Sequence, residues 1–65
     1  MTDARYWAVA GEVCTLKELR VLELADRHGL SQRTIAMSLG LSRSAVRERL
    51  ENARRKIKQA LEEAA

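Results

Sequence analysis

The stretch from Ser31 to Leu50, SQRTIAMSLGLSRSAVRERL, constrains the fold more than any other, because it contains two short helical patterns separated by one glycine. Ser31 is typical of a residue that caps the start of a helix, and Gly40 is typical of the left-handed residue that ends one. We therefore expect a helix over residues 32–39. Its buried face is predicted to consist of Ile35, Ala36 and Leu39.

A second helix is predicted to begin directly after this glycine. Ser42 is a second capping residue, and apolar residues then repeat at alternating steps of four and three. These apolar positions are Val46, Leu50, Ala53 and Ile57. No helix breaker follows, so we expect the helix over residues 43–63. Because it begins so soon after Gly40, the two helices must cross steeply, which is the geometry of a helix-turn-helix unit.

The sequence before this unit predicts a supporting helix. Thr15 and Glu18 have the spacing of a capping box, which fixes the start of the helix at Leu16. We expect this helix over residues 16–28, with Gly29 at its C-terminal end. Its inner face is predicted to be Leu16, Leu19, Leu22 and Ala25, widened by Val21 and Leu24.

Residues 1–13 are expected to form an N-terminal arm or a short helix, although Gly11 weakens the helical pattern. Trp7, the one tryptophan of the chain, is predicted to be a packing anchor against the far half of the last helix, near Ile57 and Leu61. The candidate caps of this helix are Thr2 and Asp3. The residues along its one side are Tyr6, Trp7, Ala10 and Val13.

Together these patterns predict one all-α domain over residues 1–65. It is a small trihelical helix-turn-helix bundle with an extended C-terminal recognition helix and a short N-terminal helix. A hydrophobic content of 46% without proline suits a small helical bundle and argues against a disordered chain. The sequence has neither a membrane-spanning apolar run nor a secretory leader pattern, so we expect a cytoplasmic protein without a membrane partner.

The residues do not support catalysis, and we expect no enzyme. The sequence has no set of nucleophile, base and orienting residue, and no glycine-rich phosphate loop. His28 has no second ligand at metal-binding spacing, so we expect a surface or capping role for it and no metal. The single Cys14 cannot form an internal disulfide and is interpreted as a small hydrophobic residue. No cofactor is predicted.

The distribution of charge favours nucleic acid as the partner. Residues 30–50 carry a net charge of +3, which equals the net charge of the whole chain. At 100° per residue, four basic side chains of the last helix fall on one edge beside its apolar stripe. These side chains are Arg43, Arg47, Arg54 and Lys58. A solvated helix face can carry such charge by chance, but its coincidence with the helix-turn-helix spacing favours DNA binding.

The start of the last helix provides the residues for reading a major groove. Arginine can donate two hydrogen bonds to guanine, and a small apolar residue can contact a thymine methyl group. The predicted base contacts are Arg43, Ser44, Ala45 and Arg47. The predicted phosphate contacts, at helix starts and along the basic edge, are Gln32, Arg33, Ser42 and Arg54. Further candidate DNA contacts are Thr34, Glu48 and Lys58.

The segment TLKELRVLELADRHGLSQRTIAMSLGLSRSAVRERLENARRKI resembles the helix-turn-helix of region four of bacterial sigma factors and is similar to the LuxR-type response-regulator domain. The resemblance runs from Cys14 to Ile57, about two thirds of the chain. It implies a trihelical domain from a bacterium or phage that binds duplex DNA through the helix opened by Ser42. It also implies base contacts by Arg43, Ser44 and Arg47.

Two functions are consistent with these observations. The first is a sequence-specific regulator of transcription that binds double-stranded DNA, as a small bacterial or phage repressor or activator. The alternative is a sigma-like interaction module that docks on RNA polymerase or on a sigma factor. The base-reading side chains after Ser42 favour the regulator, whereas the interaction module would use the basic edge to contact an acidic partner.

The last helix is longer than groove reading requires, so its far half needs a cover. The N-terminal helix of the same chain can supply that cover, and so can the last helix of a second subunit. The two can coexist. The residues expected in a homodimer are Ile57, Leu61 and Ala64 of the C-terminal helix, or Tyr6 and Trp7 of the N-terminal arm.

Overall fold

The computed structural model describes residues 4–64, and this part of the chain is all-α, as predicted. The expected caps of the first helix, Thr2 and Asp3, lie outside the described residues. The helices are α1 (Ala4–Val13), α2 (Leu16–Asp26), α3 (Gln32–Leu39) and α4 (Arg43–Ala64).

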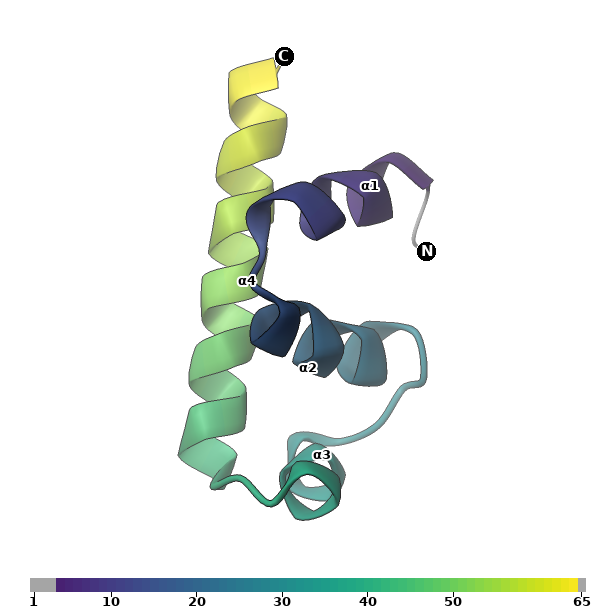
Figure 1. Ribbon diagram of the computed structural model, residues 1–65, viewed down its shortest axis with the longest axis vertical. Coiled ribbons are helices and arrows are strands. Elements are labelled where there is room, and N and C mark those ends of the chain that lie inside the picture. The colour runs from purple at the N-terminus through teal and green to yellow at the C-terminus, as the bar shows by residue number, and fades with distance from the viewer. Residues whose placement is uncertain (1–3, 65) are drawn as a thin grey trace.

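Helix α4 is the longest of the described helices and runs along the longest axis of the molecule (Figure 1). The other three helices lie on one side of it: α1 against its C-terminal half, α2 against its middle and α3 at its N-terminal end. Helices α2 and α3 also contact each other, so that α2, α3 and the first half of α4 form the trihelical unit. Helix α1 covers the far half of α4, which confirms the first of the two covers expected for it.

The core is built on the apolar stripe of α4 that the sequence predicts. Its four positions, Val46, Leu50, Ala53 and Ile57, are at most 2% exposed. Complete burial of one aliphatic side chain of this kind stabilises a fold by about 2 kcal/mol, so the stripe provides much of the stability of so small a domain. The residues packed against it from the other helices are Ala10, Val21, Leu22, Ile35 and Ala36.

The predicted capping box at the start of α2 is confirmed. The Thr15 side chain accepts a hydrogen bond from the Glu18 amide at 3.1 Å, and the Thr15 amide donates to Oε1 of Glu18 at 2.9 Å. At the other end, α2 stops at Asp26, two residues earlier than predicted. The chain turns earlier because the Leu30 amide donates back to the Leu24 carbonyl at 3.0 Å, with Gly29 at a φ of +68° between them.

The predicted inner face of α2 is wrong at Leu16, which is 84% exposed. Positions three residues apart drift by about 60° around a helix, so Leu16 lies about 120° from Leu22. The side chains that α2 buries are instead those of Val21 and Leu22, together with the carboxylate of Glu18.

The two aromatic residues of α1 point to different neighbours. The Trp7 ring packs against the core and lies 4.4 Å from the guanidinium carbon of Arg27, at the C-terminal end of α2. The Tyr6 ring meets Trp7 edge to face, with the centroids 5.4 Å apart. Tyr6 lies beside Ile57 and Leu61 in a surface groove, and Trp7 and Leu61 both pack against the core that contains Ile57.

A part-buried ion pair ties α2 to α4. Nζ of Lys56 donates to both carboxylate oxygens of Glu18, at 2.8 and 3.1 Å, while the same carboxylate accepts from the Thr15 amide. Burial alone would raise the pKa of Glu18, but Lys56 and Thr15 together outweigh it, and the pKa lies below its usual range. The ionised carboxylate is therefore the form that the fold stabilises.

We expect Glu18→Gln to reduce stability in a pH-dependent way. Because the folded pKa of Glu18 is lowered, its charge stabilises the fold above the ordinary pKa of 4.5, and this contribution is lost as the pH falls through the folded value. The variant should lose about 1 to 2 kcal/mol near neutral pH and much less near about pH 3, measured by urea denaturation.

The control for this experiment is Glu23→Gln, which removes an exposed carboxylate 3.9 Å from Arg27. An exposed pair of this kind contributes little, so its loss should change stability by less than about 0.5 kcal/mol at either pH. An equal loss for Glu18→Gln at both pH values would contradict the assigned role of the Glu18 charge.

Candidate nucleic-acid interface

The corner between α3 and α4 has the geometry predicted from the sequence. Gly40 ends α3 in the left-handed conformation, with φ 68° and ψ 36°. Its amide donates to the Ala36 carbonyl, and so does the amide of Leu41, at 2.9 Å. The partly buried Leu41 packs against the core, and α4 begins at Arg43. This short turn makes α3 cross α4 steeply, as Figure 1 shows.

Two serines cap the helices of this corner. Ser31 accepts a hydrogen bond from the Thr34 amide, and Ser42 accepts one from the Ala45 amide, both at 3.1 Å. Each hydroxyl can also donate: Ser31 donates to Oγ1 of Thr34 at 2.9 Å. The first amides of an α-helix have no partner within the helix and point outward from its start. These donors, with the positive end of the helix dipole, form an environment that favours an anion.

The starts of α3 and α4 together line a shallow hollow of about 240 Å³. Here the structure brings one predicted phosphate contact, Gln32, beside three predicted base contacts. The lining residues are Gln32, Arg43, Ser44 and Arg47. Residues from two helices therefore converge on one surface, which the sequence could suggest only through the helix-turn-helix spacing.

A second hollow, of about 450 Å³, adjoins the first along the outer face of α4. It contains the predicted base contact Ala45 and the further candidate Glu48. It also contains Glu51, which sequence reasoning missed although Glu51 follows Arg47 by one helical turn. The lining residues are Ser42, Ser44, Ala45, Arg47, Glu48 and Glu51.

The ion pairs of the described residues lie away from this corner. They join Arg27 to Glu23, Arg54 to Asp26 and Lys56 to Glu18. Within residues 4–64, none of the three exposed arginines at the corner forms an ion pair. These arginines are Arg33, Arg43 and Arg47. Among the described residues, the corner therefore presents three arginine side chains to solvent without an ion-pair partner.

Two of the predicted DNA contacts lie elsewhere. NH2 of Arg54 donates to Oδ1 of Asp26 at 2.8 Å, which links α4 to α2, so the guanidinium has a carboxylate partner within the protein. Lys58 is fifteen residues beyond Arg43, about 22 Å along α4. Neither side chain lines the two hollows at the corner.

The rest of the described chain offers little other site chemistry. Within residues 4–64, no group of three or more His, Cys, Asp or Glu side chains could hold a metal ion. The thiol of the partly buried Cys14 lies 3.8 Å from the Ala53 carbonyl. Burial, and then the nearby Glu18, raise the pKa of Cys14 and favour its neutral form. None of the described helices has the length and hydropathy needed to cross a bilayer.

Comparison with known proteins places this corner inside a family match. Residues 13–59 match the family model described as Sigma-70, region 4. The match includes α2, α3, most of α4 and every residue that lines the two hollows. It leaves outside nearly all of α1 and the last turn of α4. No curated protein and no solved structure matches the chain.

We expect Asp26→Asn to test whether Arg54 can reach DNA. If Arg54 exchanges its carboxylate partner for a phosphate, removing the Asp26 charge makes that exchange easier and should strengthen duplex binding about three- to tenfold. Gel shifts at several salt concentrations measure the change and the number of phosphates neutralised.

The matched control is Glu23→Gln, which removes one negative charge from the same helix and leaves the Arg54–Asp26 pair intact. It corrects for the change in net charge. Equal effects of the two variants on duplex affinity would show that Arg54 makes no phosphate contact.

Proposed function

The chain belongs to the sigma-70 region 4 family of DNA-binding helix-turn-helix domains, and on that premise we propose that it is a sequence-specific regulator of transcription. The family is a DNA-binding one and not a family of enzymes. In the proposed mode, the N-terminal tip of α4 enters the major groove of duplex DNA. The observation that carries the proposal is the set of exposed arginines without ion pairs that converge at the corner of α3 and α4 within the described residues 4–64.

Base reading is assigned to the first turn and a half of α4. Arg43 and Arg47 are one helical turn apart, both are exposed, and both line the hollow at the corner. Each can donate two hydrogen bonds to O6 and N7 of a guanine. Ser44 and Ala45 lie between them and are small enough to let the helix approach the base edges. Ser44 can donate or accept a hydrogen bond, and the Ala45 methyl group can contact a thymine methyl group.

Phosphate contacts are assigned to the helix starts. Gln32 and Arg33 open α3, and Ser42 precedes α4, so their side chains lie at the helix starts, where the first helix amides are free to bind an anion. Thr34 offers a hydroxyl one step further along α3. These contacts fix the depth and register of α4 in the groove without distinguishing one base from another. Arg54 adds a further phosphate contact when its guanidinium leaves Asp26 and binds a DNA phosphate.

The acidic residues of the reading face favour sequence specificity over general DNA binding. Glu48 and Glu51 lie beside Arg47 in the second hollow. A carboxylate can accept a hydrogen bond from the cytosine amino group, and it is repelled by phosphates when no such partner is present. A face with both charges therefore discriminates among sequences, whereas a uniformly basic face binds any duplex with similar strength.

A second candidate function is docking on RNA polymerase or on a sigma factor. It is favoured by the family, because sigma region 4 binds RNA polymerase as well as DNA. The two functions differ in what the tip of α4 contacts. A regulator uses it to read bases, whereas a docking module uses the basic edge to meet an acidic protein surface.

Selection of bound duplexes from a random pool, followed by gel shifts, tests the proposed function. A regulator should enrich one motif and bind it at least about a thousandfold more tightly than random DNA, with affinity that falls steeply as salt rises. A docking module should enrich no motif and should bind all duplexes weakly. Pull-down of purified RNA polymerase then tests the second candidate directly.

We expect Arg47→Ala and Arg33→Ala to affect DNA binding in different ways. Loss of a bidentate guanine contact should cost about 1 to 3 kcal/mol on the selected site and much less on random duplex. Loss of a phosphate contact should weaken both duplexes alike and reduce the salt slope by about one.

The control for both variants is Arg5→Ala, which removes an exposed arginine from α1, at the other end of the molecule (Figure 1). Its effect should reflect the change in net charge alone. If Arg47→Ala and Arg33→Ala had the same ratio of specific to random affinity, the division between base and phosphate contacts would be wrong.

A further inference from the structure

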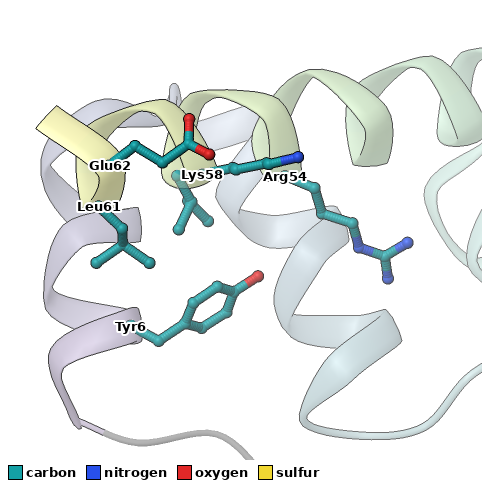
Figure 2. A pocket seen from close by; sticks show the side chains of 6 residues that line it. Tyr6, Arg54, Lys58, Leu61 and Glu62 are labelled. Carbon is teal, nitrogen blue, oxygen red and sulfur yellow. The ribbon is translucent and has the colours of Figure 1, made fainter.

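A second surface of the molecule, far from the corner of α3 and α4, contains a groove with a mainly apolar lining. The groove has a volume of about 380 Å³ and lies between α1 and the C-terminal half of α4. Figure 2 shows the Tyr6 ring and the Leu61 side chain extending from these two helices into the space between them. The lining residues are Tyr6, Arg54, Ile57, Lys58, Leu61 and Glu62.

The floor of the groove is apolar and its rim is charged. Ile57 is buried, while Tyr6 and Leu61 are partly exposed. Burial, and then the nearby Asp26 carboxylate, raise the pKa of Tyr6, so its hydroxyl remains neutral at physiological pH. The rim consists of Arg54, Lys58 and Glu62. The groove therefore offers a neutral floor between side chains of both signs.

Half of the residues that line this groove lie outside the family's helix-turn-helix unit. Tyr6, Leu61 and Glu62 lie outside the matched residues 13–59. Its position along α4 is also remote from the tip proposed to read DNA, because α1 packs at the opposite end of α4 from α3 (Figure 1). The floor of the groove therefore lies away from the α4 tip, although Arg54 on its rim is also assigned a phosphate contact.

Two charged side chains of the rim form no ion pair within the described part of the chain. Arg54 is paired with Asp26 at 2.8 Å. Within residues 4–64, no ion pair involves Lys58 or Glu62, and both side chains are exposed. They lie one helical turn apart on the same side of α4, one positive and one negative.

This order of charges makes the end of α4 complementary to itself. When two copies of a helix pack antiparallel about a two-fold axis, residues equally far from the axis on either side face each other. With the axis at the height of Ala60, each Lys58 faces Glu62 of the second copy. The two-fold symmetry therefore creates two Lys58–Glu62 pairs. The two Leu61 side chains lie next to the axis, where each can enter the groove of the other copy.

We propose that this groove is a homodimer interface, in which the C-terminal turns of α4 from two copies pack antiparallel with Leu61 in the grooves and reciprocal Lys58–Glu62 pairs at the rim. The mixed rim favours a second copy as the occupant, because Lys58 and Glu62 are complementary to each other in the antiparallel arrangement. The proposal is independent of the base and phosphate contacts assigned to the tip.

The proposed dimer is expected to be weak. Only about two turns of each α4 overlap, so the interface falls below the roughly 1,200 Å² of typical stable complexes. We expect a dissociation constant on the order of 10⁻⁴ M. Sedimentation equilibrium from about 10 µM to about 1 mM covers this range.

Charge reversal at the rim tests the arrangement. Lys58→Glu or Glu62→Lys alone places like charges opposite each other at both symmetric positions, and each should weaken dimerisation about tenfold. The double variant Lys58→Glu/Glu62→Lys restores both pairs with the signs exchanged, and its dissociation constant should return to within about threefold of the original. The control is Lys17→Glu, an equal reversal at an exposed position of α2.

Circular dichroism at low concentration checks that each variant folds, because the single reversals also alter the i,i+4 neighbours within α4. A variant that only weakens the i,i+4 contacts within α4 should lower the melting temperature of the monomer without changing the dimer dissociation constant. A chain that stays monomeric at about 1 mM, or a double variant that associates as poorly as the single ones, overturns the proposal.

Discussion

Burial of the apolar stripe of α4 is the interaction on which the rest of the structure depends. α1, α2 and α3 each contact α4; α2 and α3 also contact each other, and Trp7 of α1 packs beside Arg27 at the end of α2. The helices are therefore organised by one common partner. Because Val46 and Ile57 are both fully enclosed, the stripe holds α3 at one end and α1 at the other. The exposed residues of α4, at its tip and beside α1, lie on the faces of the helix that this stripe leaves open to solvent.

The features that the sequence predicted well are local ones. The caps at Thr15 and Ser31, the left-handed Gly40 and the period of the α4 stripe each depend on residues a few positions apart. Their chemistry is decided within one or two turns, so a single sequence is sufficient to recognise them. The helix-turn-helix corner follows from these signals together, which is why the family resemblance is visible in the amino-acid sequence alone.

The features that the sequence missed depend on neighbours from elsewhere in the chain. The true buried face of α2 was set by how α4 approaches it, so the exposure of Leu16 could not be read from an i,i+3 pattern. The partner of Arg54 lies 28 residues away in α2. Such outcomes require the packing angle of two helices, which no local pattern contains.

The continuity of α4 has a consequence for how this protein can change. A single unbroken helix joins the arginine-bearing tip to the groove beside α1. The angle between these two surfaces around the helix axis is therefore fixed by the number of residues between them. Inserting or deleting one residue between Val46 and Ile57 would turn one end by about 100° relative to the other. Substitutions can therefore accumulate along this helix, but changes in its length are constrained to whole turns.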